Sequence, residues 1–91
     1  MELSISENRE KSRFETKLDG KTAFIDYKRK SDVMYLTHTE VPEELGGKGV
    51  GSSLVKFALE AAKKEGKKVI SQCSFVSGYI ERHPKFKDYL V

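Results

Sequence analysis

Four glycines and a lysine stand close together in the middle of the chain and could bind an anion. The glycines are Gly46, Gly47, Gly49 and Gly51, with Lys48 among them, and a helical pattern begins where they end. Glycine lets the backbone turn sharply and approach a ligand, while the first N–H groups and the positive end of a helix attract negative charge. The first turn of that helix holds no acidic residue. The segment therefore predicts a phosphate cradle.

Two common glycine motifs do not fit this segment. A Walker loop needs a lysine directly after its last glycine, whereas Gly51 is followed by Ser52. A dinucleotide fingerprint that starts at Gly49 would need a glycine where Leu54 stands, and the expected acidic residue on a second strand is missing. The cradle must therefore belong to another class of phosphate site.

A helix is expected directly after the glycines, and it must supply the N–H groups of the cradle. Apolar residues recur at steps of three and four from Val50 to Ala62, which predicts one buried helical face. Gly66 ends the pattern, and Lys63 and Lys64 stand where cations suit the negative end of a helix.

Three strands are expected before the loop. Polar and apolar residues alternate over 13–18, and 22–29 follows as the partner strand, with Ala23, Ile25 and Tyr27 on one face. Residues 33–41 form the third strand because they are rich in β-branched and aromatic side chains. Asp19-Gly20 predicts a hairpin turn, 30–32 predicts a second turn, and Pro42 ends the third strand since it cannot donate to a sheet. Leu3 and Ile5 could begin a further short strand. Consecutive hairpins make an antiparallel meander.

The chain after the helix predicts a fourth strand over 68–75, a short helix over 76–82 and a tail, 85–91, that docks as an edge strand. A strand, a helix and a strand in succession place the fourth strand parallel to the third through a right-handed crossover. Tyr79 is expected to pack in the core. The predicted fold is α+β, an antiparallel β-meander followed by a βαβ unit, in a single domain over 1–91.

The loop resembles the acetyl-CoA pyrophosphate loop of the Gcn5-related N-acetyltransferases, which reads Arg or Gln, two residues, Gly, any residue, Gly or Ala. Gly49-Val50-Gly51 match its Gly-x-Gly, whereas Gly46 stands where the family usually has Arg or Gln. The closer resemblance is to the minimal, YjdJ-like members of that superfamily. Their signature looks like His38-Thr39-x-Val41, Leu45-Gly46-Gly47-x-Gly49-Val50-Gly51 and Cys73-Ser74-Phe75.

This resemblance implies acetyl-CoA as the cosubstrate and a sheet whose third and fourth strands splay apart. It puts the pantetheine arm against 39–41, the pyrophosphate within 46–52 and the thioester near Cys73. Larger members insert a pair of helices after their first strand, and their absence here implies an open or partner-covered acceptor cleft. The implied cofactor-binding residues are Thr39, Val41, Gly46, Gly47, Lys48, Gly49, Val50, Gly51 and Ser52.

Acetyl transfer to an amine needs a deprotonated nucleophile, a donor to the developing oxyanion and an acid for the leaving thiolate. Alternation along the third strand is expected to place Leu36, His38 and Glu40 on one face. His38 titrates near neutral pH, and burial could tune Glu40 upward, so either could be the catalytic base. Equally, His38 could be a structural residue and Glu40 a solvated strand end.

Cys73 is expected to share a face of the fourth strand with Val69, Ser71 and Phe75. Its thiolate could accept the acetyl group before passing it on, or the amine could attack the cofactor directly while Cys73 only lines the site. A lone cysteine on an apolar strand is often just a small buried hydrophobe. The resemblance favours a functional role, because minimal members carry a cysteine in this Cys-Ser-Phe setting.

Composition narrows the classes of function. The 17 basic and 14 acidic residues give a net charge of +3, and they alternate along the chain, which favours a solvated surface over a nucleic-acid site and suits an anionic cofactor. One cysteine excludes an internal disulfide, and with two histidines it makes a metal cluster improbable. The chain has no apolar run of membrane length, and 1–10 lacks the apolar stretch of a signal peptide, so we expect a cytoplasmic protein.

These observations predict an acetyl-CoA-dependent N-acetyltransferase that modifies a primary amine of a small molecule or a protein. Gly46 and the missing helices motivate an alternative, a non-catalytic CoA-binding or protein-interaction module. Binding of nucleotide phosphate through the same loop is a third hypothesis. We expect no nucleic acid, membrane or metal partner, and a homodimer could form through the exposed tail strand.

Overall fold

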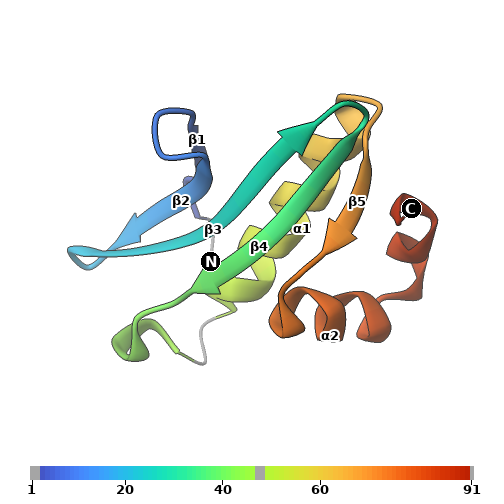
Figure 1. The fold of residues 1–91 in the computed structure, drawn as a ribbon. Coiled ribbons are helices and arrows are strands. Elements are labelled where there is room, and N and C mark those ends of the chain that lie inside the picture. Colours follow the sequence, from blue (N-terminus) through green and yellow to red (C-terminus); the bar gives the residue numbers. More distant parts are fainter. Residues whose placement is uncertain (1–2, 47–48, 91) are drawn as a thin grey trace.

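The computed structural model of the chain describes residues 3–46 and 49–90. Within these ranges the strands form a sheet in chain order, with α1 behind it along β3 and β4 (Figure 1). Strands β1 to β4 pair antiparallel, and β5 pairs parallel to β4, which confirms the predicted meander and βαβ unit. The elements are β1 (Ser6–Asn8), β2 (Arg13–Leu18), β3 (Lys21–Lys30), β4 (Val33–Glu40), η1 (Glu43–Leu45), α1 (Val50–Lys64), β5 (Lys68–Ser71), α2 (Ser74–Arg82) and η2 (Pro84–Tyr89).

The hairpin between β2 and β3 turns where the sequence predicts. Asp19 and Gly20 both have positive φ, 53° and 75°. Two consecutive left-handed residues make a turn whose twist matches that of the paired strands. The register that follows places the buried residues of β3 on the same side of the sheet as those of β2.

The core lies between one face of α1 and one face of the sheet. Helix α1 buries the predicted stripe, which runs from Val50 to Ala62 at steps of three and four. Gly66, with φ of 70°, ends the turn after the helix, and the Lys67 N–H donates back to the Ala62 carbonyl at 2.9 Å. The buried residues of the sheet are Phe14, Thr16, Ala23, Ile25, Tyr27, Met34, Leu36 and Val69.

A β-bulge in β4 interrupts the alternation of its side chains. The pair Tyr27–Leu36 is followed by the pair Asp26–His38, so Thr37 stands opposite no residue of β3. Directly paired residues of antiparallel strands have side chains on the same face. Leu36 therefore lies with Tyr27 on the core side, whereas His38 lies with Asp26 on the outer side.

The expectation that Leu36, His38 and Glu40 share a face is wrong for this reason. Beyond the bulge, Thr39 pairs with Ile25, which is fully buried. Glu40 pairs with Phe24, the residue before Ile25 on β3, whose side chain lies on the outer face. Thr39 thus takes the inner face of β4, and His38 and Glu40 take the outer face.

The chain after α1 differs from the prediction at two places. β5 ends at Ser71 rather than 75, because Val76, Tyr79 and Ile80 bury one face of a helix that begins at Ser74. Cys73, Ser74 and Phe75 are therefore not strand residues. The sequence pattern predicted a strand that continues to 75, because a short apolar run fits a strand as well as a helix.

The tail is not an edge strand. Residues 84–89 form the 3₁₀ helix η2, which begins with Pro84 and buries Phe86, and only Leu90 makes an isolated parallel bridge, with Val69. Proline suits the first turn of a helix because its φ is already helical. Within residues 84–90 the tail therefore offers no strand of the kind considered above for a homodimer.

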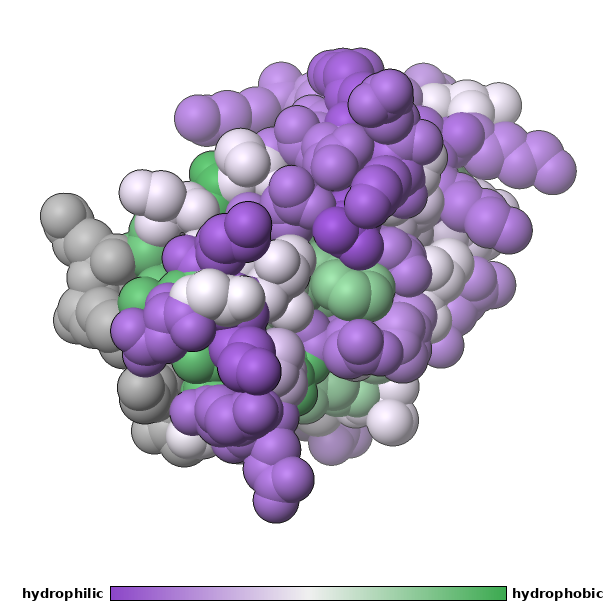
Figure 2. Space-filling model, turned by 90° about the vertical axis from the view of Figure 1, so that its left-hand side faces the viewer, coloured by the Kyte–Doolittle hydropathy of each residue, from purple (hydrophilic) through white to green (hydrophobic). Residues whose placement is uncertain are grey.

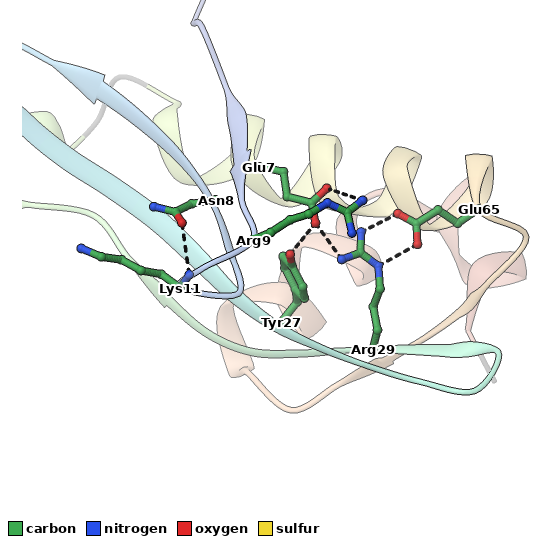
Figure 3. A network of polar contacts seen from close by, with 7 residues as sticks. All are labelled: Glu7, Asn8, Arg9, Lys11, Tyr27, Arg29 and Glu65. Atoms are coloured by element: carbon green, nitrogen blue, oxygen red, sulfur yellow. Dashed lines mark hydrogen bonds and ion pairs between the residues drawn. The ribbon is translucent and has the colours of Figure 1, made fainter.

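Arg29 ties three elements together on the side of β1. Its guanidinium donates to both carboxylate oxygens of Glu65, at 2.8 and 2.6 Å, and to Glu7 at 2.7 Å. The Tyr27 hydroxyl donates to the same carboxylate oxygen of Glu7 (Figure 3). This network, the Arg29 network, connects β1 and β3 with the residue that follows α1.

The surface on the β1 and β2 side is hydrophilic over most of its area, and its hydrophobic residues lie in separate small areas (Figure 2). Such scattered apolar residues are normal on a protein surface and do not indicate an interface. Neither α1 nor α2, nor any other helix in the described ranges, is both long and apolar enough to cross a membrane.

Candidate functional site

Strands β4 and β5 part halfway along β4. Their last pair is Leu36 with Ser71, and one more bond follows, from the Gln72 N–H to the Leu36 carbonyl at 2.9 Å. β4 continues to Glu40 beside β3, whereas the segment after β5 turns into α2 (Figure 1). Among the described residues, the β5 side of 37–41 thus has no strand partner, and this opening is the predicted splay.

The N-terminus of α1 lies next to this opening and leaves its first amides free of helix bonds. Gly49 caps the helix in the left-handed conformation, with φ of 74°, and provides no side chain. The first helix bond runs from the Ser53 N–H to the Gly49 carbonyl at 3.0 Å. The N–H groups of Val50, Gly51 and Ser52 therefore precede the hydrogen-bonded part of the helix, with no acidic side chain in that turn. This arrangement attracts an anion.

A hollow of about 340 Å³ joins the helix N-terminus to the end of β4. It brings together six of the nine residues predicted to bind the cofactor, and adds two that were not predicted, Leu45 and Phe75. Of the other three, Thr39 is not in the lining of the hollow but contacts Cys73, and Gly47 and Lys48 lie outside the described residues. The six are Val41, Gly46, Gly49, Val50, Gly51 and Ser52.

Gly51 lets two side chains approach the helix closely. A Cβ at this position would lie 2.7 Å from Cζ of Phe75 and 3.3 Å from Cγ2 of Val41. The first of these distances is shorter than any ordinary carbon contact, so the ring sits where a side chain of residue 51 would be. The sequence signal for this contact was available, since a glycine in a helix usually marks a close approach.

The side chain of Cys73 makes a contact across the opening, from the start of α2 to β4. It stands at the N-cap of α2, is half-buried, and its Sγ donates to Thr39 Oγ1 at 3.6 Å. Burial raises the pKa of the thiol, but the amides of Val76 and Phe75 and the Thr39 hydroxyl stabilise the thiolate and bring the pKa below its ordinary value. The Cys73 side chain does not form a capping hydrogen bond with these helix amides, so they act on the thiolate through their nearby N–H dipoles. These contacts favour the thiolate form of Cys73.

His38 and Glu40 lie on the outer face, apart from Cys73. His38 Nε2 is 3.5 Å from Glu40 Oε1, and both side chains are more than half exposed. The His38 ring also faces Phe24, with 6.2 Å between the ring centroids. The three predicted catalytic residues therefore form two groups. Cys73 contacts Thr39 on the inner face of β4, whereas His38 and Glu40, the neighbours of Thr39 in sequence, lie on the outer face.

Other parts of the described structure fit an anion or a metal less well. A larger hollow of about 660 Å³ at the far end of α1 is lined by four lysines, but they already have partners there. Lys68 donates to the Asp88 carbonyl, and Lys63 lies over the Tyr89 ring. The carbonyl end of a helix also repels anions. Within the described residues, no three His, Cys, Asp or Glu side chains gather to hold a metal ion.

Comparisons with known proteins identify the family of this chain. Residues 13–89 match the family model described as GCN5-related N-acetyl-transferase. The protein NATD1 of Mus musculus is 27% identical over 86 residues, which cover 90% of this chain and 77% of that protein. NATD1 of Homo sapiens is also 27% identical, with 90% and 75% covered.

A solved structure shares the fold. The NMR solution structure of a GCN5-like protein from Staphylococcus aureus superposes with a TM-score of 0.77 at 30% sequence identity. The match covers 98% of this chain and 88% of that one. The similarity therefore extends over nearly the whole chain.

Proposed function

Because the chain belongs to the GCN5-related N-acetyltransferase family, we propose that it transfers an acetyl group from acetyl-CoA to a primary amine. The observation that supports this most is the opening between β4 and β5 beside the free N-terminus of α1. One end of the opening offers amides for a diphosphate, and the other leads to Cys73.

Acetyl-CoA would lie along this opening. The free amides of Val50, Gly51 and Ser52 would bind the pyrophosphate, with Gly46 and Gly49 letting the backbone approach it. The unpaired edge of 39–41 would hydrogen-bond the amides of the pantetheine arm, as a strand edge does. The thioester would then reach the region where Cys73 contacts Thr39.

Two routes of transfer use this site. In direct attack, the amine nitrogen bonds to the thioester carbon, His38 or Glu40 takes the amine proton, and the carbon–sulfur bond breaks to release the CoA thiolate. In the two-step route, the Cys73 thiolate takes the acetyl group and CoA leaves; the amine then attacks the new thioester on Cys73. The lowered pKa of the Cys73 thiol supports the second route.

The position of the base fits an amine that arrives from the outer face of the sheet. His38 and Glu40 are exposed there, and no helix covers β2, β3 and β4 on that side in Figure 1. The same open face motivates the alternative of a non-catalytic CoA-binding module, as does Gly46, which has no side chain to offer the cofactor.

A turnover assay separates these functions. Release of CoA from acetyl-CoA is measured with a panel of small amines and lysine peptides, alongside calorimetric titration of acetyl-CoA, CoA and ATP. The proposal predicts binding of both CoA forms and acceptor-dependent release. Equal binding of CoA and acetyl-CoA without release would support the non-catalytic module, and binding of ATP but not CoA would support a nucleotide site.

A further inference from the structure

Phe75 is unusual among the large hydrophobic residues of the described chain because its side chain is 40% exposed. It is the second residue of α2 and follows Cys73 by two positions. A single exposed phenyl ring is not by itself informative. The surroundings of this ring are, because they belong to the candidate cofactor site.

The ring lies directly on the free turn of α1. Its Cζ and Cε1 atoms are 2.7 and 3.1 Å from the place that a Cβ of Gly51 would take, and Val41 Cγ2 is 3.3 Å from the same place. Gly51 and Val41 are both in the hollow that joins α1 to β4. Phe75 therefore connects the starts of both helices with the end of β4.

Two pairs of residues line the opening, and in both segments the paired residues are two positions apart. Cys73 contacts Thr39, and two residues further along each segment Phe75 and Val41 both lie close to Gly51. The start of α2 thus runs alongside the unpaired end of β4. The Phe75 ring is the aromatic member of the apolar lining of the hollow, with Val41, Leu45 and Val50.

We propose that Phe75 is a positioning residue that packs against the pantetheine arm and directs its thioester toward Cys73. This inference depends on the proposed binding of acetyl-CoA. The arm carries methyl and methylene groups between its two amides, and the exposed side of the ring can cover them while the β4 edge bonds the amides. Covering both apolar surfaces removes them from water, which favours binding of the arm but does nothing for the phosphates.

A matched pair of ligands isolates this contact. Dephospho-CoA differs from ADP only by the pantetheine arm, so the ratio of their affinities measures what the arm contributes. Both are titrated into the full chain and followed by amide chemical shifts, which also report weak binding. The variants are Phe75→Ala, Phe75→Leu and a control, Tyr35→Ala, which removes a ring some six residues away from Val41, about 20 Å along β4.

The proposal predicts that Phe75→Ala weakens dephospho-CoA about tenfold and ADP less than twofold, that Phe75→Leu falls between, and that Tyr35→Ala changes neither. Equal weakening of both ligands by Phe75→Ala would overturn it, as would no weakening. If the wild-type chain bound neither CoA nor dephospho-CoA, the proposed function would fall together with this inference. Thermal denaturation of each variant verifies that it is folded.

Discussion

The sulfur of Cys73 lies 3.6 Å from the hydroxyl oxygen of Thr39, and this contact spans the place where β4 and β5 have separated. Thr39 reaches the inner face only because the bulge at Thr37 shifts the register of β4. The same shift turns His38 and Glu40 outward. One extra residue in a strand therefore separates the thiol from the candidate bases.

The contact with Thr39 should control the reactivity of the thiol. Hydrogen bonds from Thr39 and from the amides at the start of α2 lower the pKa of Cys73 against the effect of burial. We expect alkylation by iodoacetamide to rise with pH around a midpoint below the ordinary cysteine value of about 8.5. Thr39→Val should move that midpoint upward. Thr22→Val, on β3, is the control, and an unchanged midpoint in Thr39→Val would contradict this role.

The two-step route predicts a covalent adduct on one residue. Mixing the protein with acetyl-CoA and without acceptor should increase its intact mass by one acetyl group. The adduct should be absent in Cys73→Ala, and turnover should fall by about two orders of magnitude or more. If Cys73→Ala keeps full turnover and the wild type forms no adduct, direct attack is the route and Cys73 only lines the site.

The base should be one of the two exposed residues on the outer face. His38→Gln or Glu40→Gln should lower kcat about 10² to 10⁴-fold without destabilising the fold, because both side chains project into solvent. The variant that removes the base should also remove the acidic limb of the pH–rate profile. Asp26→Asn, on the same face, is the control. Full activity in both variants would contradict a base on this face.

Gly51 should tolerate a methyl group structurally but not functionally. A Cβ there meets the far end of the Phe75 ring, which can swing into solvent, so we expect Gly51→Ala to change the free energy of unfolding by about 1 kcal/mol or less. Its CoA affinity should fall about tenfold, since the ring leaves its place. Adding Gly51→Ala to Phe75→Ala should then cause little further loss. Equal losses in both backgrounds would show that the ring is not involved.

The Arg29 network should stabilise the fold and not the reaction. The side chains of Arg29, Glu7 and Glu65 are roughly one fifth to three tenths exposed, so we expect Arg29→Gln to lower the free energy of unfolding by about 1 to 3 kcal/mol, against almost no change for Lys28→Gln. Chemical denaturation of both variants measures this. An equal effect of the two substitutions would contradict it.

The same network gives a pH dependence of stability. Hydrogen bonds from Arg29 lower the pKa of Glu7 and of Glu65 in the folded chain. Their stabilising effect is therefore complete above the unfolded value of about 4.3 and is lost as pH falls through the lowered folded values. Thermal melting from pH 7 to pH 2 should show this loss, and the loss should be smaller in Arg29→Gln.

Much of the fold could be predicted from local patterns. Asp19-Gly20 has the chemistry of a hairpin turn, and the stripe from Val50 to Ala62 repeats at the helical period, so both were located correctly. The glycine loop was located in the same way, because glycines such as Gly49 and Gly51 indicate a turn of the backbone or a close approach of other atoms to it. These features depend on neighbours in sequence.

The errors concern features that depend on distant neighbours. The bulge at Thr37 has no local mark, because the residues from Thr37 to Glu40 are all polar and fit either register. The end of β5 at Ser71 is set by the burial of Val76 and Tyr79 against α1 and the sheet, and not by a breaking residue. The faces of His38, Glu40 and Cys73 followed from those two features and were therefore wrong.

The most direct test follows the backbone amides at the start of α1 in a titration with acetyl-CoA. With isotope-labelled protein, the N–H signals of Gly49, Val50, Gly51 and Ser52 should shift saturably, together with those of Thr39 and Val41 on the open edge of β4. Amides of the β2–β3 hairpin at Asp19 and Gly20 should stay in place. If saturating acetyl-CoA left the signals of 49–52 unchanged, the assignment of this opening as the acetyl-CoA site would be wrong.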